Sequence, residues 1–550
     1  MRLIDRRIGL LFAGFLLCFL VIIGRAFWLQ GVQGAELASE AVSQQTETVT
    51  VPGLRGSLLD RRGNELAASE DAATIYATPY QVKNPPQAAA KLAPILGLSK
   101  AEVLESLTAD SGFSYVAHRV SIPVAAKVER LGIEGIGELP DSLRTYPQGD
   151  MAGQVIGAVG SENQGLSGLE AGEESALKGS DGERRIVRDA LGDPIRMETV
   201  KEASDGEDVK LTLDPLIQEK TERVLAEVGE TYAPKGATAI VVDPRNSQIL
   251  AMANWPPVDP SDLAGTTSEE LMNQATGLNY EPGSTFKAFT VSAALEEKLV
   301  TPETAFTLEP SIQVADRTIE DAEPRGTETM TVAQILARSS NVGAVTIGLE
   351  LGSEKFSKWI SRFGFGRKTG VQFPGEQAGI VPPLDEYSGS TMGNLPIGQG
   401  VAVTPMQMVA GYTAIANGGI LRPPQLIERV GDETVHEPKG HRVIASGVSA
   451  QVREMLEGVL AAGGTASEVS VPGYKLAGKT GTAQVAENGG YSESKYVASF
   501  IGFAPAQDPK LLAAVIVDQP QGDIYGGSVA APAFGKIAAF ALPYLGVAPE

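Results

Sequence analysis

The hydrophobic pattern separates a short apolar run at the N-terminus from a long remainder of mixed patterning. Residues 8–29 are mostly apolar and include a single charge, Arg25. This length is near the minimum for a helix that spans a membrane. A cleaved signal peptide is the alternative, because Arg2, Arg6 and Arg7 before the run suit both. We expect an uncleaved anchor at residues 8–29, since the run is long for a signal and no small-x-small cleavage site follows at once.

The charges beside this run predict how the chain lies across the membrane. Arginines before the run outnumber the one within it, and positive charge favours the cytoplasmic side. We therefore expect a cytoplasmic tail at residues 1–7 and a single-pass protein of the cell membrane, with the remaining chain outside the cytoplasm. Residues 30–50 are polar and predict a helical or extended stalk. Residues 51–203 mix strands with short helices and are expected to form a first domain.

The pattern changes near residue 208, where a second domain is expected at residues 208–550. Helical periodicity covers residues 215–228 and a C-terminal segment at 530–545. Apolar runs separated by turn residues predict two β-hairpins, with strands at 237–242 and 249–253, and at 496–503 and 511–517. Because these hairpins bracket a long helical insert, the expected fold is α+β, an antiparallel sheet with helices on both faces.

Three short motifs follow one another in the second domain, and together they predict chemistry at a serine. They read Ser284-Thr-Phe-Lys287, Ser339-Ser-Asn341 and Lys479-Thr-Gly481. Such a set supplies a nucleophile, a base, a proton relay and a cation for a carboxylate, as an enzyme with an acyl-serine intermediate requires. Each motif alone is weak, because similar copies occur at Ser175/Lys178, Ser492/Lys495, Ser161/Asn163 and Lys368-Thr369-Gly370.

The sequence around Ser284 favours this serine as the nucleophile. A Pro282-Gly283 turn precedes it, and a mostly apolar run of helical length follows at residues 286–295. Lys287 lies three residues on, on the same helix face, where it can reach the serine hydroxyl. Burial would disfavour the charged form of this lysine and make its amine a usable base. The rival serines lie in polar segments instead.

The second and third motifs have roles that depend on local structure. Ser339 and Asn341 stand at a break between two helical stretches, where small polar residues are usually helix caps. The functional alternative makes Ser339 a proton relay and Asn341 a hydrogen-bond partner of the substrate's peptide. Lys479 must lie on a strand edge, where glycine lets a ligand approach the backbone. It would offer charge to a carboxylate, while the amides of Thr482 and Ser284 complete an oxyanion hole.

Two other interpretations of the lysine motifs are less favoured. Lys368 stands in a glycine-rich connection from loop to strand and is interpreted as structural. Residues 473–480 match the phosphate-binding P-loop pattern residue for residue. A P-loop needs a helix directly after it, whose amides hold phosphate. Residues 481–490 are too short and too rich in glycine for that helix, so nucleotide binding is not expected.

Composition argues against several other classes of function. The chain of 550 residues has a formal net charge of -22, which argues against nucleic acid as a partner, because such binding depends on Lys and Arg. Its one cysteine, Cys18, lies in the apolar run, so no internal disulfide can form. The three histidines, His118, His436 and His441, show no metal-ligand spacing, and neither a metal nor another cofactor is expected.

Over nearly its whole length the sequence resembles the class B penicillin-binding proteins. In the first domain, residues 55–67, 144–149 and 165–170 are similar to signatures of that class outside its catalytic domain. In the second domain, Gly398-Gln-Gly400 and Tyr525-Gly-Gly527 fit its transpeptidase domain. Glu281 before the Pro-Gly-Ser sequence, together with Asn341, is similar to the FtsI-like division type. Asn246-Ser247 departs from the class, which commonly has Thr-Gly in the first hairpin.

This resemblance implies a peptidoglycan D,D-transpeptidase whose first domain is a pedestal. Ser284 then attacks the penultimate D-Ala of a stem peptide ending in D-Ala-D-Ala, and Lys287 is the base. Ser339 and Lys479 help proton transfer. The resemblance also implies that the substrate carboxylate is held by Lys479 and by its neighbours on the strand, Thr480, Gly481 and Thr482.

The same resemblance implies partners and inhibitors. β-Lactams are expected to acylate the serine covalently, and a SEDS glycosyltransferase similar to FtsW is expected to work with the protein, among other division proteins, in septal wall synthesis. An elongation-type transpeptidase, a D,D-carboxypeptidase or β-lactamase, and a non-catalytic β-lactam sensor remain as alternatives. The three motifs do not distinguish an amine acceptor from water.

Overall fold

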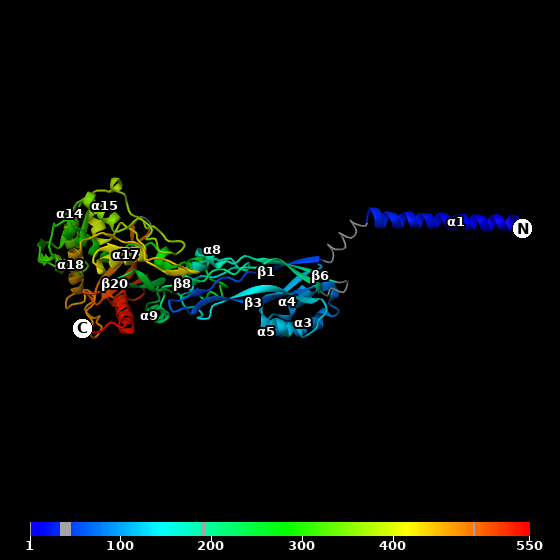
Figure 1. Cartoon of the computed structure of the whole chain (residues 1–550). Helices are drawn as coiled ribbons and strands as arrows, with labels where there is room; N and C mark the ends of the chain where they lie inside the picture. Colours follow the sequence, from blue (N-terminus) through cyan, green and yellow to red (C-terminus); the bar gives the residue numbers. More distant parts are fainter. Residues whose placement is uncertain (1, 34–45, 189–193, 488–489, 550) are drawn as a thin grey trace. The chain divides into compact units, whose positions relative to one another are not determined.

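Two compact units alternate along the chain. The computed structural model describes residues 2–33, 46–188, 194–487 and 490–549 (Figure 1). The first unit takes Met1–Leu54, Glu70–Leu143 and Gly179–Gly206, and the second takes Arg55–Ser69, Arg144–Lys178 and Glu207–Glu550. The second unit therefore draws on two segments from within the range expected for the first domain. Each unit buries a hydrophobic core of its own.

The first unit begins with the N-terminal apolar helix. α1 (Arg2–Phe27) continues into the π-helix η1 (Trp28–Val32), and the stretch Arg6–Val32 is long and apolar enough to cross a membrane. Its large apolar side chains are exposed, which a helix in water would not favour. The expected anchor at 8–29 lies inside this stretch, and the protein fits a single-pass membrane protein. Of the expected stalk, residues 34–45 lie outside the described residues.

The rest of the first unit contains two small antiparallel arrangements. β6 pairs with β1 and β7 in one, and β3 pairs with β4 in the other. Three helices, α3, α4 and α5, cluster together (Figure 1), and α4 and α5 contact β4. Ser99 and Glu102 form a capping box that starts α4. The elements are β1 (Thr46–Val51), β3 (Glu65–Ala77), η2 (Pro79–Gln81), α3 (Pro85–Leu96), α4 (Lys100–Leu107), β4 (Ser114–Ser121), α5 (Ile122–Glu129), β5 (Ile136–Thr145), β6 (Gly182–Arg188) and β7 (Pro194–Lys201).

A five-stranded antiparallel sheet is the centre of the second unit. Its order is β10-β9-β21-β20-β19, so strands from the two ends of this unit's long C-terminal segment lie side by side. Both predicted hairpins are confirmed as pairs of neighbouring strands. The strands are β9 (Gly236–Asp243), β10 (Gln248–Trp255), β19 (Ala477–Glu487), β20 (Gly490–Ala504) and β21 (Leu511–Asp518).

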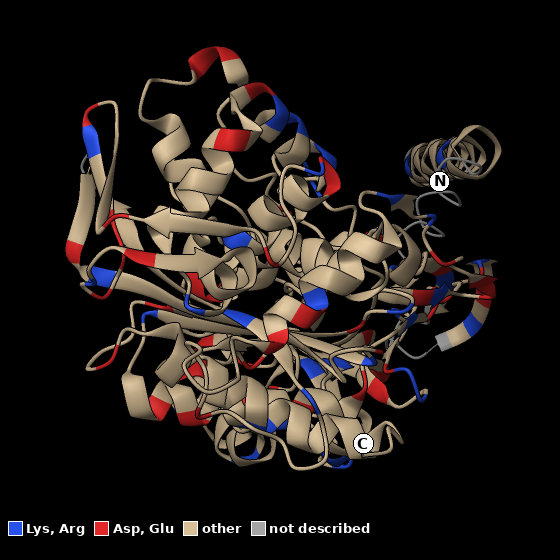
Figure 2. Ribbon diagram, turned by 90° about the vertical axis from the view of Figure 1, so that its left-hand side faces the viewer, with Lys and Arg blue, Asp and Glu red and all other residues tan. Residues whose placement is uncertain are grey.

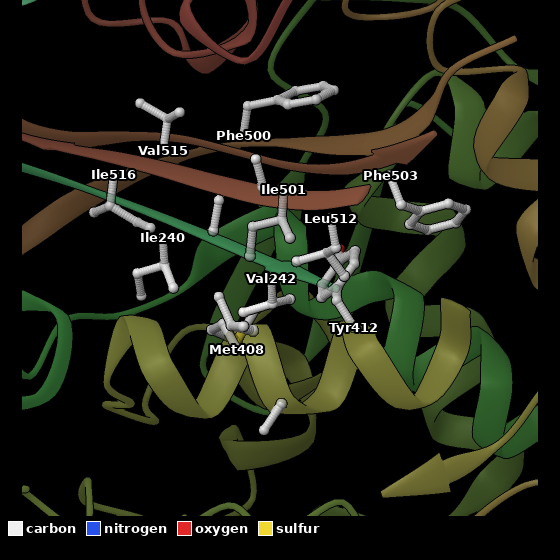
Figure 3. Close-up of a cluster of buried hydrophobic side chains, with 14 of the residues drawn as sticks. Ile240, Val242, Met408, Tyr412, Phe500, Ile501, Phe503, Leu512, Val515 and Ile516 are labelled. Atoms are coloured by element: carbon white, nitrogen blue, oxygen red, sulfur yellow. The ribbon is translucent and has the colours of Figure 1, made fainter. Parts of the chain in front are cut away.

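Helices cover both faces of this sheet because both faces are apolar. Ile501 and Ile516 point toward α17 (Pro405–Ala416), whereas Phe500 and Val515 point to the opposite side (Figure 3). There the ring of Phe500 lies 5.0 Å from that of Phe534 on α20 (Ala531–Tyr544). α9 (Pro215–Tyr232) packs on β9 and β10. The α+β prediction, with helices on both faces, is confirmed.

The long insert between β10 and β19 carries most of the other elements of the second unit. They include the turns and helices η3 (Gly283–Phe286), α12 (Lys287–Glu296), α13 (Val332–Ala337), α14 (Asn341–Leu351), α15 (Ser353–Arg362), α16 (Thr391–Asn394), η5 (Leu395–Ile397) and α18 (Ser446–Glu457). Short strands accompany them: β11 (Ala305–Leu308), β12 (Ser311–Val314), β13 (Arg317–Glu320), β14 (Glu328–Thr331), β15 (Ile420–Leu421), β16 (Ile427–Val430), β17 (Glu433–Thr434) and β18 (His441–Arg442).

The segments taken from the first half of the sequence join the second unit by a buried ion-pair cluster. Acidic and basic residues are interspersed along helices, loops and strands (Figure 2). Arg55 Nε and Arg144 Nε lie 2.5 and 2.7 Å from the two carboxylate oxygens of Glu170, and all three side chains are at most 1% exposed. Arg144 Nη1 also donates to the carbonyl of Gly56 at 2.9 Å.

This cluster brings three separate signatures together. Arg55, Arg144 and Glu170 each come from one of the sequence segments that resemble non-catalytic signatures of the class. They lie near β2 (Leu58–Leu59), α6 (Gly153–Ile156), α7 (Gly168–Gly172) and α8 (Glu174–Leu177), and β2 pairs in parallel with β8 (Val209–Leu211). The charges of Arg55, Arg144 and Glu170 therefore have a structural role, because they hold three separate segments of the second unit together.

Removing the shared carboxylate should destabilise the second unit strongly. Glu170→Ala leaves the buried guanidinium groups of Arg55 and Arg144 without their common partner, which costs about 3–5 kcal/mol. Urea unfolding followed by tryptophan fluorescence measures the loss. The matched control is Glu227→Ala, which removes an exposed carboxylate 2.6 Å from Lys536 and should cost less than about 1 kcal/mol. Equal midpoints for the two variants would contradict a structural role for the cluster.

Candidate active site

Ser284 lies in a tight turn at the start of a buried helix. Pro282 precedes the 3-10 turn η3, and α12 continues directly from it at Lys287. The turn is held from below by Tyr412 of α17, whose hydroxyl donates to the carbonyl of Thr285 at 2.6 Å. Ser284 is half-buried between fully buried neighbours, so its hydroxyl stands at the end of a rigid support. The predicted helix after Ser284 is confirmed, with its first turn tightened to a 3-10 turn.

Lys287 is fully buried, and its amine makes three contacts with the second motif. Nζ donates to the carbonyl of Ser339 at 2.6 Å, to Asn341 Oδ1 at 2.6 Å and to Ser339 Oγ at 3.3 Å. Burial lowers the pKa of Lys287 to about 7, although the carboxylate of Asp321 raises it. Such a pKa makes the free amine abundant at neutral pH, as a general base requires.

The amine of Lys287 is directed at the second motif and not at Ser284. Among the described residues no hydrogen bond joins Lys287 to Ser284, although the two share one turn. An ammonium group has three donors, and the three contacts with Ser339 and Asn341 use them all. Loss of one proton leaves a lone pair on Nζ, while the two short bonds can remain. Catalytic contacts are often absent from a ligand-free arrangement, so this geometry is compatible with Lys287 as the base.

The second motif forms the break between two helices that the sequence predicts. α13 ends at Ala337 and α14 starts at Asn341. Ser340 fills the capping role, because its hydroxyl accepts from the amide of Gly343 at 3.0 Å. Ser339 does not cap the helix. Its backbone is left-handed, with φ +61°, which is uncommon for a residue other than glycine. The bland interpretation of the motif as a helix cap thus applies to Ser340.

The third motif lies on β19, at the edge of the central sheet. Lys479, Thr480 and Thr482 pair with β20 across from Ile501, Phe500 and Ala498. Lys479 is fully buried, and its pKa lies well below the usual value because of burial and the nearby charge of Lys287. Thr480 Oγ1 lies 2.6 Å from Thr465 Oγ1, and Thr482 Oγ1 accepts from the amide of Gly526 at 3.1 Å.

Glycines allow β19 to approach the serine turn. A Cβ atom at Gly481 would lie 2.4 Å from Ser499 Oγ and 3.0 Å from the carbonyl of Pro282. Gly283, with φ +53°, would place a Cβ atom 3.0 Å from that of Ala483. The strand therefore runs against the turn that carries Ser284. In this way the fold brings the three motifs together, although nearly 200 residues separate the first from the last.

The rival copies of the motifs lie elsewhere. Lys368 is exposed in a loop, and the expected strand after it is absent from the described residues 371–374; its neighbour Thr369 donates from its amide to Glu376 at 2.7 Å. Ser175 lies on the short helix α8, and Ser492 accepts from the amide of Lys495 at 3.3 Å. Residues of the P-loop pattern continue into β19 rather than a helix, as predicted.

Several residues that build the site belong to no motif that the sequence reveals. Asp321 holds the second motif, Tyr412 supports the first, and Thr465 supports the third. None of them has a recognisable spacing from the motifs they serve. Glu281 is indicated by the resemblance to the division type alone. Its carboxylate accepts from the amide of Gly400 at 3.0 Å and from the hydroxyl of Tyr491 at 3.2 Å. In the part of the chain that the structure describes, no group of three His, Cys, Asp or Glu could hold a metal ion.

Comparison with known proteins identifies the family. The family model for the penicillin-binding protein transpeptidase domain matches residues 237–539, and that for the penicillin-binding protein dimerisation domain matches residues 50–211. Stage V sporulation protein D of Bacillus subtilis is 37% identical over 547 residues, which cover 97% of this chain and 84% of that protein. The chain belongs to the class B penicillin-binding proteins. Its C-terminal part is a transpeptidase domain of the serine acyltransferase type.

Two further similarities support membership of this family. The peptidoglycan D,D-transpeptidase FtsI of Escherichia coli is 30% identical over 556 residues, which cover 100% of this chain and 93% of that protein. The crystal structure of penicillin-binding protein 3 from Mycobacterium tuberculosis, complexed with aztreonam, superposes with a TM-score of 0.73 at 31% identity and covers 91% of this chain and 98% of that one. The class B penicillin-binding protein fold thus extends over both units.

The pKa of Lys287 predicts how acylation of this penicillin-binding protein depends on pH. As the predicted base, Lys287 can take a proton from Ser284 only as the free amine, and its pKa is about 7. The second-order rate constant for labelling by a fluorescent penicillin should therefore rise with pH through a midpoint near 7 and level off above it. Stopped reactions across this range measure the profile.

A second buried group provides the control for this profile. Burial raises the pKa of Glu222 on α9 to about 7 as well, and its carboxylate accepts from the amide of Ala152 at 2.7 Å, outside the three motifs. Glu222→Gln should leave the midpoint in place. A midpoint that disappears in Glu222→Gln would assign the pH dependence to that carboxylate and not to Lys287.

Proposed function

We propose that the protein is a peptidoglycan D,D-transpeptidase that works through an acyl-enzyme at Ser284. The observation that carries this function is the buried amine of Lys287, one turn from the serine and bonded to both Ser339 and Asn341. The family supports the substrate, because relatives bear the name peptidoglycan D,D-transpeptidase. A stem peptide ending in D-Ala-D-Ala is the donor, and β-lactams acylate the same serine.

The first half-reaction transfers the donor peptide to the enzyme. Lys287 takes the proton of the Ser284 hydroxyl as Oγ attacks the carbonyl carbon of the penultimate D-Ala. The amides of Ser284 and Thr482 stabilise the negative oxygen that forms. The C–N bond to the last D-Ala then breaks, and its nitrogen receives a proton through Ser339, Lys287 and Lys479. An ester at Ser284 and free D-Ala are the products.

The second half-reaction passes the acyl group to an amine of a neighbouring stem peptide. The amine nitrogen attacks the ester carbon and loses a proton to Lys287, and Ser284 leaves with a proton. In the first half-reaction, before the last D-Ala leaves, Lys479 offers its charge to the donor's terminal carboxylate, with Thr480, Gly481 and Thr482 lining the same strand. Asn341 hydrogen-bonds the peptide. Water in place of the amine would make the enzyme a D,D-carboxypeptidase or a β-lactamase.

We also propose an extracytoplasmic catalytic domain and a role in septal synthesis. Arginines before the apolar helix favour a cytoplasmic N-terminus. Glu281, next to the Ser284 turn, and Asn341 support the division type, and one relative is named FtsI. A SEDS glycosyltransferase similar to FtsW and other division proteins are the proposed partners. An elongation-type enzyme is the alternative, because the same active site serves either place of synthesis.

Labelling with a fluorescent penicillin tests the assignment of the site. Ser284→Ala should abolish covalent labelling, since the attacking oxygen is gone. Lys287→Ala should slow it by at least about a hundredfold, the low end for the loss of a general base. Lys479→Ala should also slow it, while the matched variant Lys368→Ala of the rival Lys-Thr-Gly copy should label at the wild-type rate. Labelling of folded Ser284→Ala protein would falsify the mechanism.

Protease accessibility tests the orientation in the membrane. Spheroplasts of cells that express the full chain should lose the transpeptidase domain when protease is added outside, because only residues 1–7 are expected in the cytoplasm. Immunoblotting of the C-terminus measures the loss, with a cytoplasmic enzyme as the control for intact membranes. Full protection of the C-terminus would reverse the proposed topology.

A further inference from the structure

The carboxylate of Asp321 holds the second motif by hydrogen bonds. This residue directly follows β13. Both oxygens of its carboxylate lie 3.0 Å from Ser340 Oγ, which donates its one hydrogen between them, and Oδ1 also accepts from the amide of Val342 at 3.0 Å. Arg325 Nε lies 2.6 Å from the same carboxylate, and both side chains are only 11–13% exposed. Burial raises the pKa of Asp321, but these hydrogen bonds and Arg325 outweigh burial and lower it. Asp321 is therefore ionised at neutral pH.

Glu320, next to Asp321, fixes the orientation of the Asn341 side chain. The carbonyl of Glu320 accepts from Asn341 Nδ2 at 2.8 Å, so the amide group must present Oδ1 to Lys287, 2.6 Å away. The chain after β13 thus holds Ser340 and Val342 through a side chain and Asn341 through a carbonyl. Ser339 lies between these fixed points with its left-handed backbone, and its carbonyl is the other short contact of Lys287.

Asp321 also supplies the carboxylate charge that acts on Lys287. Its negative charge raises the pKa of Lys287, against the lowering by burial, and Lys479 is the nearby positive group. The other elements packed on α12 add little. η3, η5 and α13 contain no charged residue. The charged residues of α14, α15 and α18 are exposed or half-buried: Glu350, Glu354, Lys355, Lys358, Arg362, Arg453, Glu454 and Glu457.

We propose that Asp321 is a positioning residue for acylation, which holds the Ser339–Asn341 turn against Lys287 and supplies the negative charge that favours the protonated lysine. Asp321 acts through Lys287 and not on the substrate. The inference rests on the proposed acylation at Ser284. The charge of Asp321 then influences the pH at which acylation begins. A residue with a purely structural role would not shift that pH.

Three variants of the full-length protein separate the charge of Asp321 from its hydrogen bonds. Asp321→Asn keeps an oxygen that can accept from Ser340 or Val342 but removes the charge. The midpoint of the rate of fluorescent-penicillin labelling against pH should move to lower pH by about one unit, the scale of a nearby opposite charge. Arg325→Gln leaves the charge of Asp321 without its partner and should move the midpoint to higher pH.

Ser340→Ala is the matched variant without a change of charge. It removes the hydroxyl that donates to Asp321 and caps α14, so labelling should slow while the midpoint stays in place. A wild-type midpoint in Asp321→Asn would overturn the inference. If that variant does not fold, an unmoved midpoint in Arg325→Gln would overturn it equally. Failure of the proposed function is distinct, because the wild-type protein itself would then show no labelling at Ser284.

Discussion

The burial of two lysine amines is the constraint on which the site depends. A pKa of Lys287 lowered from 10.5 to about 7 corresponds to about 5 kcal/mol against the protonated form in the folded protein. This free energy destabilises the folded protein. The cost is absent above the pKa of the unfolded state, grows as pH falls toward 7, and is fully present below pH 7. Burial also lowers the pKa of Lys479, the second buried amine, well below its usual value. The surrounding fold must offset both, and in return it provides an amine that can accept a proton at neutral pH.

The offset comes from packing on three sides. Phe286 and Phe289 of the serine turn lie among Phe365 and Tyr412, with ring centroids 4.9–5.4 Å apart, so the turn is fixed by an apolar core. The central sheet fixes β19, and Gly481 allows that strand to lie against the turn. The third side is polar: it is the Ser339–Asn341 turn held by the chain after β13. Aromatic packing keeps water away, while the polar side satisfies the hydrogen bonds of the buried amine.

Sequence could predict the parts of this site that rest on local chemistry, and not those that rest on tertiary contacts. The Pro-Gly turn, the helix after Ser284 and both hairpins follow from local patterns, and the structure has them. Asp321 could not be found in this way, because a single acid after a four-residue strand has no distinctive spacing. The same holds for Glu170, whose two arginine partners lie 115 and 26 residues away. The alternation of two units along the chain is likewise a long-range property.

The contacts of Lys287 also explain how one arrangement can serve both protonation states. The two short bonds, to the carbonyl of Ser339 and to Asn341 Oδ1, need two N–H donors, and both an ammonium and a neutral amine have them. Only the longer contact with Ser339 Oγ, at 3.3 Å, requires the third proton. A change in the protonation of the lysine therefore leaves both short bonds in place, and Ser339 Oγ lies within reach of the amine. Fixed acceptors of this kind reduce the reorganisation that the reaction requires.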